Sequence, residues 1–407
     1  MGGLVGSAVR LIAWGMARRA GASTGSGSVR LPAAVRRART IVVVALAEVG
    51  DLVLLSSFLR GLRSLAPSAR VTLVCPPDGA HLYETSDDVD EVLVYDARMP
   101  RLLRPLLLPR RARLFARRRL RGRFDLAIVP RWDTDHHFAA AVALFSEAPR
   151  RVGHAEASNG RKLVLNSGFD LLFTDVVTSV GIAHEIERHG SMLRALGAEQ
   201  PANGLHLALT GADRRAASEA LAPVGESASL AAFGIGAAHP KRRWDVARYA
   251  ELGRTLQRDY GMQVVVVGGP ADVAVQDELL HAIGPGARGL AGRLTLRQSG
   301  AVLERCRLFV GSDSAPMHLA AAVGTPCVEI SCHPMTGDPL HSNAPERFAP
   351  WGVASRVVRP RRAVPPCHAS CTAEEPHCIL AIDHAMVLDA VESLLRELDD
   401  APAGVGR

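Results

Sequence analysis

Short, continuous apolar runs alternate with amphipathic segments along most of the chain, and this alternation limits the folds that are possible. The first run covers residues 41–46 (IVVVAL), and a helical pattern follows it up to Pro67. Continuous apolar runs of this length are typical of parallel strands that are covered on both faces. Strands that alternate with helices predict an α/β fold in which helices cover both faces of a parallel sheet.

The alternation runs through the chain twice, with a more polar break at residues 200–204. Before the break, further strands are predicted at 71–75, 91–95 and 125–129, with helices over 136–145 and 184–197. After it, the sequence predicts strands at 229–236, 262–267, near 288, 307–311 and 326–331, and helices over 244–260, 271–283, 294–306, 316–324 and 383–398. We therefore predict two doubly wound, Rossmann-like domains. Because such sheets bind ligands at the carboxyl ends of their strands, we expect the site in a cleft between two facing sheets.

The length of 407 residues fits two domains that each bury a core of their own. We predict a basic N-terminal extension and a C-terminal helix with its tail around them. The predicted boundaries are 1–39 for the extension, 40–204 for the first domain, 205–380 for the second domain, and 381–407 for the last helix and tail.

Positive charge is concentrated in two segments. Residues 1–40 and 98–123 hold eighteen arginines and no acidic residue, whereas the rest of the chain has 30 basic against 41 acidic residues. Such patches attract nucleic acid or an anionic membrane. The second segment interleaves its arginines with leucines and lacks the aromatic residues on which bases stack, so we predict no nucleic-acid partner. Prolines break its first half, and residues 110–121 predict a basic amphipathic helix on a membrane surface; a solvated arginine face is the alternative.

Residues 2–17 form an apolar stretch that Arg10 interrupts. The stretch is shorter than the roughly 20 residues of a spanning helix, and no basic residue precedes it as in a signal peptide. It predicts an interfacial helix followed by a flexible linker over residues 21–29, or else a disordered extension. The odd number of seven cysteines argues against a disulfide framework and favours a reducing cytoplasm.

The segment from Gly311 to His318 directly follows a predicted strand and opens a helix. Ser314 is placed to cap this helix, and the free N–H groups of its first turn make an anion site that suits a phosphate. His318 lies one turn further on and can reach the same anion, whereas Asp313 suits sugar hydroxyls. The alternative is an ordinary capped turn with a buried histidine.

Asp51 and Lys241 each lie near the end of a predicted first strand. A carboxylate at this place can take a proton from a hydroxyl nucleophile, although an aspartate in the first turn of a helix is commonly a cap. Lys241 is one of two lysines in a chain with 46 arginines, which indicates that a compact ammonium group is needed there, unless it has been retained by chance. The sequence GGPAD at 268–272 would let the backbone approach a nucleotide. The fingerprint GxGxxG follows neither first strand, which argues against a nicotinamide enzyme.

Several of these segments together resemble glycosyltransferase family 9, the heptosyltransferases that transfer ADP-activated heptose to the lipopolysaccharide core. The most specific segment is VGSDSAPMHLAAAVGTPCV at 310–328, and supporting segments lie at 47–63, 184–197, 240–252 and 264–272. The resemblance covers most of residues 40–398. It implies the GT-B fold of two facing Rossmann-like domains and transfer with inversion at the anomeric carbon, without a metal or another cofactor.

The resemblance also implies roles for single residues. Asp51 matches the base that deprotonates the acceptor hydroxyl, and Lys241 matches the lysine that steadies the leaving diphosphate. At position 315 the family usually has glycine, and Ala315 is tolerable there if its backbone is not left-handed. The donor-binding positions that the resemblance implies are Gly269, Asp272, Asp313, Ser314, Ala315 and His318.

Two further polar clusters stand out. Arg131, Asp133 and Asp135, followed by two histidines, lie at the end of a predicted strand and predict acceptor binding or, alternatively, a metal cluster. Near the C-terminus, three thiols and a histidine can form a tetrahedral zinc site, with free thiols or a labile disulfide as the alternatives. These four residues are Cys367, Cys371, His377 and Cys378.

We therefore predict an inverting glycosyltransferase that uses a nucleotide-sugar donor and a lipid-linked glycan acceptor. Its arginine patches would hold it on the cytoplasmic, inner face of the inner membrane. A non-catalytic membrane scaffold of the same fold, or an enzyme similar to a sugar-nucleotide epimerase, are the alternatives.

Overall fold

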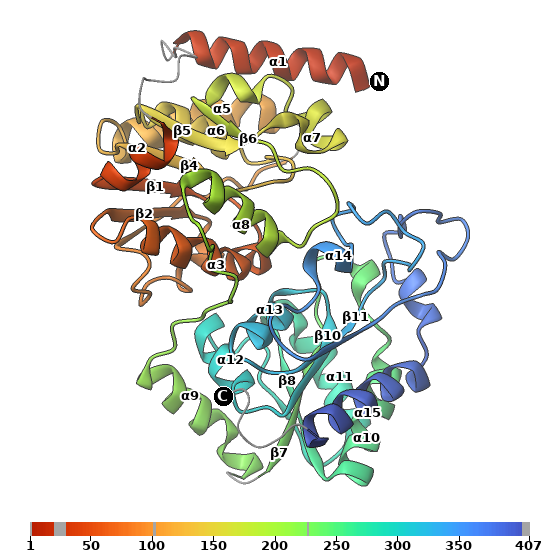
Figure 1. The fold of residues 1–407 in the computed structure, drawn as a ribbon. Coiled ribbons are helices and arrows are strands. Elements are labelled where there is room, and N and C mark those ends of the chain that lie inside the picture. The colour runs from red at the N-terminus through yellow and green to blue at the C-terminus, as the bar shows by residue number, and fades with distance from the viewer. Residues whose placement is uncertain (1, 20–29, 101–102, 226–227, 401–407) are drawn as a thin grey trace. The chain divides into compact units, whose positions relative to one another are not determined.

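A computed structural model of the chain describes residues 2–19, 30–100, 103–225 and 228–400 (Figure 1). The chain divides into two compact units. Unit 1 comprises Met1–Gly181 and Glu185–Asn203, and unit 2 comprises Ile182–His184 and Gly204–Arg407.

Unit 1 is built on a six-stranded parallel sheet with the order β3-β2-β1-β4-β5-β6. The chain starts in the middle with β1, moves outward through β2 and β3, and then returns to β4 on the other side of β1. In this topology the carboxyl ends of β1 and β4 form the switch point where ligands bind. The strands are β1 (Thr40–Val44), β2 (Arg70–Cys75), β3 (Glu91–Val94), β4 (Leu126–Val129), β5 (Arg150–His154) and β6 (Asp175–Val177).

Unit 2 repeats the same topology in its own six-stranded parallel sheet, with the order β12-β11-β10-β7-β8-β9. Its switch point lies at the carboxyl ends of β7 and β10. The two sheets confirm the predicted fold class of two doubly wound α/β domains. The strands are β7 (Ser229–Gly234), β8 (Met262–Val267), β9 (Ala287–Gly289), β10 (Leu308–Ser312), β11 (Cys327–Ile330) and β12 (Ser355–Val358).

Helices cover both sheets, because most of them connect two parallel strands and pack their apolar side on the sheet (Figure 1). The helices of unit 1 are α1 (Gly2–Arg19), α2 (Leu31–Arg37), α3 (Val49–Leu65), α4 (Pro77–Ala80), α5 (Arg104–Arg119), α6 (Ala139–Phe145), α7 (Gly160–Leu165) and α8 (Glu185–Leu196). Those of unit 2 are α9 (Gly211–Leu221), α10 (Val246–Tyr260), α11 (Val273–Ile283), α12 (Leu296–Leu303), α13 (Ala315–Ala322), α14 (Pro345–Phe348) and α15 (His384–Asp400).

The described part of the N-terminal extension packs on unit 1. Helix α1 buries Ala13 and Met16 in the core of the unit, where it lies against α7 and touches α5. Leu11 and Trp14, on the other side of the same helix, are exposed. The predicted linker over residues 21–29 lies outside the described residues.

The prediction that prolines break the first half of the second arginine segment is wrong. Helix α5 begins at Arg104 and contains Pro109. Pro105 occupies the first turn, where its missing N–H costs no hydrogen bond, and Pro109 removes a single helical bond close to that turn. Three fully buried residues of α5, Leu108, Ala112 and Ala116, pack into the core and offset this loss. None of the described helices is long and apolar enough to cross a lipid bilayer.

Candidate active site

The switch point of unit 1 brings Asp51 and Arg131 together. Asp51 lies in the first turn of α3, which follows β1, and Arg131 follows β4. Arg131 Nη1 lies 3.2 Å from Asp51 Oδ2, and both side chains are partly exposed. Glu48 occupies the N-cap position of α3, and Asp51 pairs with Arg131 rather than capping the helix. Asp51 Oδ1 has no partner in the described part of the chain, so this oxygen is open to a hydroxyl group.

Arg131 is held as a cation at this place. Burial alone would lower its pKa, but the carboxylates of Asp51, Asp133 and Asp135 outweigh this effect and raise the pKa of Arg131. Its Nε also donates to the carbonyl oxygen of Thr134 at 2.7 Å. The guanidinium group therefore has a fixed orientation toward Asp51.

Asp135 contributes to the fold instead of presenting a free carboxylate to a ligand. It is buried, and its two oxygens accept hydrogen bonds from the backbone N–H groups of His137, Ala139 and Ala140 at the start of α6. His137 Nδ1 lies 3.0 Å from the carbonyl oxygen of Leu46. Among the described residues, the acidic and histidine side chains of this loop form no group with the geometry of a metal site.

Lys162 is a residue whose importance the sequence analysis missed. Its buried ammonium group donates to three carbonyl oxygens, of Arg131 at 3.3 Å, Trp132 at 3.2 Å and His154 at 3.0 Å. Burial lowers the pKa of Lys162 to about 8. Three acceptors around one nitrogen suit an ammonium group and not a planar guanidinium group, which explains a lysine in an arginine-rich chain. The rarity of lysine was the available signal.

Trp132 fixes the same loop from its other side. Its indole Nε1 donates to the carbonyl oxygen of Ser179 at 2.6 Å, and the guanidinium carbon of Arg188 lies 3.4 Å from its ring centroid. Arg188 comes from α8, within the segment 184–197 that the sequence analysis had singled out. The loop after β4 is therefore anchored by Lys162 and Arg188 together.

The switch point of unit 2 is arranged around Asp313, directly after β10. Arg242 Nη1 donates to Asp313 Oδ2 at 3.0 Å, and His318 Nε2 lies 3.6 Å from Asp313 Oδ1. Burial favours the neutral acid, but Arg242 and His318 together hold the pKa of Asp313 below its usual range. The Arg242 guanidinium group also donates to Asn343 Oδ1. The backbone carbonyl oxygen of Arg242 accepts a hydrogen bond from the Ser312 hydroxyl group at 2.5 Å. Asp313 and His318 were predicted from the sequence, whereas Arg242 and Asn343 were not.

The N-terminus of α13 lies next to Asp313. Ser314 occupies the N-cap position, but its hydroxyl donates to the carbonyl oxygen of Ser312 at 3.1 Å and does not cap the helix, so the predicted side-chain cap is wrong. Ala315 is helical and not left-handed, so its methyl group meets no backbone strain. The N–H groups of Ser314 and Ala315 have no acceptor in the described part of the chain. They remain available to an anion at the positive end of the helix dipole.

Lys241 lies in the loop after β7, and its ammonium group donates to the carbonyl oxygen of Cys371 at 2.8 Å. This contact joins two segments that lie 130 residues apart.

The four candidate metal ligands of the C-terminal segment lie close together. Their ligand atoms are all within 4.8 Å of one another. They are Cys367, Cys371, His377 and Cys378.

Glu329 lies beside the site at the register position opposite Gly311 in the sheet. It is fully buried, and burial and then the Asp313 carboxylate raise the pKa of Glu329 well above its usual range. Both causes favour the neutral acid, which does not repel a diphosphate.

The loop after β8 is shaped by Asp272. Its Oδ2 accepts a hydrogen bond from the N–H group of Gly269 at 2.9 Å. A Cβ atom at Gly236 would lie 2.3 Å from this carboxylate, and one at Gly268 would lie 2.7 Å from it. A glycine at Gly268 in this loop, and at Gly236 in the loop after β7, therefore leaves room for the Asp272 carboxylate, whereas Gly269 is exposed and has room for a side chain.

Comparison with known proteins decides the family. The model of glycosyltransferase family 9 (heptosyltransferase) matches residues 113–375, which is more than half of the chain. The chain belongs to glycosyltransferase family 9. Lipopolysaccharide heptosyltransferase 2 of Salmonella typhimurium is 26% identical over 369 residues, which cover 88% of this chain and 99% of that relative.

Solved structures of family 9 have the same fold. A family 9 glycosyltransferase from Veillonella parvula superimposes with a TM-score of 0.69 at 23% identity, covering 88% of this chain and 97% of the other. The E. coli ADP-heptose lipopolysaccharide heptosyltransferase II superimposes with a TM-score of 0.64 at 22% identity, covering 88% and 99%. These likenesses confirm the GT-B fold that the sequence predicted.

Proposed function

We propose that this family 9 glycosyltransferase transfers a heptose from ADP-heptose to a hydroxyl group of a lipopolysaccharide core acceptor, with inversion at the anomeric carbon. The observation that carries this proposal is the cluster at the switch point of unit 2, where a charged Asp313 adjoins the open N–H groups of α13. A sugar diphosphate needs a carboxylate for its hydroxyl groups and positive charge for its phosphates, and this cluster offers both. The names of the full-length relatives agree with heptose as the sugar and ADP as its carrier.

On the donor side, unit 2 would bind the diphosphate at the N-terminus of α13. Charge develops on the ADP leaving group as the glycosidic bond breaks, and fixed donors that meet this charge lower the barrier. Lys241 and the N–H groups of Ser314 and Ala315 would supply them. Arg242 and His318 orient Asp313 toward the sugar hydroxyl groups. No bound cofactor is needed for this displacement.

On the acceptor side, Asp51 would accept the proton of the attacking hydroxyl group. Arg131 occupies one carboxylate oxygen of Asp51 and leaves the other open. The hydroxyl oxygen then forms the new bond to the anomeric carbon, the bond from this carbon to the diphosphate oxygen breaks, and the proton goes to Asp51. The anchored loop after β4 keeps the Asp51–Arg131 pair in place.

Nucleotide-sugar binding, measured by thermal shift, tests the donor. ADP-heptose at 100 times its Kd is expected to stabilise the protein by about 2.7 kcal/mol, which raises Tm by about 5–10 °C. ADP-glucose should give a smaller shift, and UDP- and GDP-sugars none. The variants Asp313→Ala and Asp313→Asn should lose the shift, whereas Glu278→Ala, an exposed acidic position on α11, should keep it.

Other results would overturn parts of the proposal. A shift with a UDP- or GDP-sugar alone would refute ADP-heptose as the donor. Folded protein that responds to no nucleotide sugar would point to the non-catalytic scaffold. Release of free or epimerised sugar without any acceptor would point to the epimerase-like enzyme.

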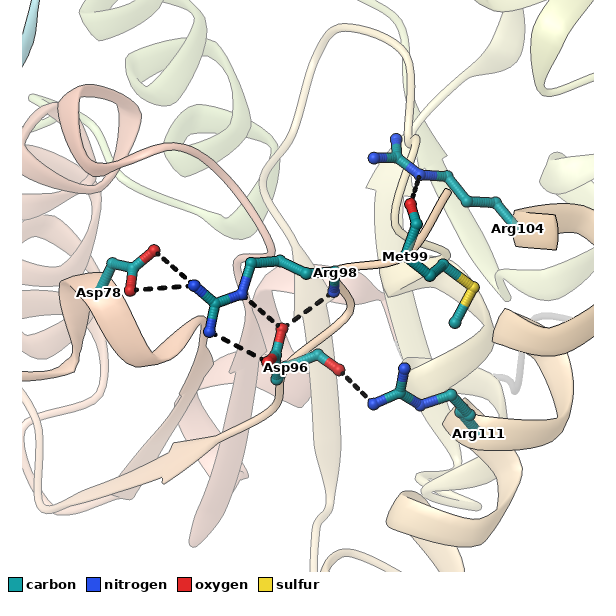
Figure 2. A network of polar contacts seen from close by, with 6 residues as sticks. All are labelled: Asp78, Asp96, Arg98, Met99, Arg104 and Arg111. Carbon is teal, nitrogen blue, oxygen red and sulfur yellow. Dashed lines mark hydrogen bonds and ion pairs between the residues drawn. The ribbon is translucent and has the colours of Figure 1, made fainter. Parts of the chain in front are cut away.

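We further propose that unit 1 binds an anionic membrane through α1 and α5, at the inner face of the inner membrane. Figure 2 shows that Arg98, Arg104 and Arg111 are engaged within the protein: Arg98 pairs with Asp96 and Asp78, and the other two donate to backbone carbonyl groups. In contrast, the exposed side chains of Arg117, Arg118 and Arg119 on α5 have no hydrogen-bond or ion-pair partner among the described residues.

Exposed apolar side chains accompany these arginines. Leu106 and Leu114 of α5 are more than half exposed, and so is Leu11 of the neighbouring α1, where Trp14 is half exposed. Water solvates a purely basic face well, but not leucines of this exposure, whereas a bilayer interface accepts both. A cleft of about 470 Å³ between the end of β3 and α5 would accept a phosphate headgroup. It is lined by Val94, Tyr95, Asp96, Arg111, Leu114, Phe115, Arg118 and Arg119.

Co-sedimentation with vesicles tests the membrane proposal. The protein should bind vesicles that contain phosphatidylglycerol and should not bind those of phosphatidylcholine alone, and added salt should weaken binding. The double variant Arg117→Gln/Arg118→Gln should bind about 30-fold more weakly, since each arginine near the surface contributes about 1 kcal/mol. The matched control is Arg361→Gln/Arg362→Gln, two exposed arginines of unit 2. Equal binding to both kinds of vesicle, or equal losses in both variants, would contradict a docking surface on α5.

A further inference from the structure

We propose that unit 2 contains a structural zinc site formed by Cys367, Cys371, His377 and Cys378. Their ligand atoms all lie within 4.8 Å of one another, three thiols and one imidazole nitrogen. Structural zinc sites are closed, tetrahedral and made of cysteine and histidine, and Cys₃His is one of their usual ligand sets. The ion would complete a group of side chains that the fold already brings together.

The measured distances around His377 fit such an ion. Its Nδ1 lies 3.6 Å from Cys367 Sγ and 3.5 Å from Cys378 Sγ. Bond lengths of about 2.3 Å to sulfur and about 2.0–2.1 Å to nitrogen, at tetrahedral angles, put the two ligand atoms about 3.6 Å apart. A zinc ion can therefore sit between these atoms with little rearrangement of the side chains.

The environment of His377 and Cys367 also indicates a metal. The two hydrogen-bond contacts of His377 Nδ1 in the described structure are both to sulfur atoms, which are weak partners for an imidazole. The backbone N–H group of Thr372 lies 3.4 Å from Cys367 Sγ and donates to it. Such a donor to sulfur stabilises a metal-bound thiolate by orienting it and offsetting its charge.

The position of the cluster in the fold gives the ion a structural task. Between the end of β12 at Val358 and the short 3₁₀-helix Cys378–Ala381, the chain forms neither a helix nor a strand. Irregular segments of this length are uncommon in compact domains unless something else holds them. Cys367, Cys371 and Cys378 are nevertheless buried in the core of unit 2. A zinc ion would cross-link these three cysteines within a segment that lacks regular secondary structure.

The same segment supports the proposed active site. The carbonyl oxygen of Cys371 accepts the hydrogen bond of Lys241, and that of Ala369 accepts one from the N–H group of Asp338 at 2.9 Å. By binding the Cys371 thiolate, the ion would also fix the Cys371 carbonyl oxygen and, through it, the position of Lys241. This consequence rests on the proposed function, whereas the zinc site itself does not.

Metal analysis of the full-length protein tests the site. Protein purified without a histidine tag and without chelators should contain about one zinc per chain by inductively coupled plasma mass spectrometry. A mercurial thiol reagent should release this zinc, as measured with a chromogenic chelator. Protein grown with added zinc that contains none, or that contains iron in its place, would refute the zinc site. A disulfide between any two of the three cysteines, found by alkylation and mass spectrometry, would do the same.

Variants keep the test independent of folding and of transferase activity. His377 is partly exposed, so the variant His377→Asn should fold. Its zinc content should be lowered at least tenfold after dialysis, and its Tm by roughly 5–10 °C. Cys371→Ser should behave similarly. The control is Cys306→Ser, a buried cysteine whose thiol contacts the Val302 carbonyl, and it should keep its zinc. Normal zinc content in His377→Asn would overturn the assignment, and a wild-type protein that holds zinc but transfers no heptose would refute the proposed function alone.

Discussion

Replacing Asp51 by asparagine is expected to lower kcat for heptose transfer by about 10²–10⁴-fold, with the protein still folded. Asparagine has nearly the same shape, and its amide oxygen can still accept the hydrogen bond from Arg131 that the structure shows at 3.2 Å. It cannot accept the proton of the acceptor hydroxyl group, so the loss should appear in kcat and leave KM for the donor nearly unchanged. Release of ADP in the presence of a lipopolysaccharide core acceptor measures this rate.

The matched control for Asp51 is Asp78→Asn. Asp78 also lies in the first turn of a helix of unit 1, α4, and also pairs with an arginine, Arg98 at 3.4 Å. Its hydrogen-bonded group contains Arg98 and Asp96 (Figure 2). Asp78→Asn should therefore keep its rate. If Asp51→Asn and Asp78→Asn lose activity equally, or neither loses it, Asp51 is not the base.

Most of the fold could be predicted from sequence because its central strands are uniformly apolar. β1 and β8 read as continuous valine-rich runs, since both faces of each strand are covered by helices. β6 and β12 were not predicted, and both lie at a sheet edge, where a strand is short and partly polar. β5, next to one edge, begins with two arginines and was also missed.

The candidate site was predictable where a residue lies in the segment between a strand and the following helix or in the first turns of that helix. Asp51, Asp313 and His318 were found in this way. Arg242 was missed because its role depends on Asp313 and Asn343, which lie 71 and 101 residues further along the chain. A local pattern cannot show such pairings. It also cannot show that the Ser314 hydroxyl donates to a carbonyl group and leaves the helix uncapped.

Replacing Lys241 by alanine is expected to lower kcat/KM by about 10²–10³-fold, the usual cost of removing one fixed group that stabilises charge on a leaving group. Lys241→Arg should not restore the rate. The ammonium group donates to Cys371 along one direction and keeps other N–H donors for the diphosphate, whereas a planar guanidinium group needs a different geometry. Steady-state kinetics with ADP-heptose measures both variants, and Arg396→Ala, an exposed cation on α15, is the control.

A lower kcat/KM in Lys241→Ala can have two causes, and the zinc content of the variant distinguishes them. Because Lys241 also holds the segment that carries Cys371, its removal could displace that segment and lower activity indirectly. If Lys241 acts on the leaving group, the variant keeps its zinc and its Tm while kcat/KM falls. A variant that loses zinc together with its rate would show that Lys241 serves the fold of the C-terminal segment. An unchanged rate would exclude both roles, since either one requires the ammonium group.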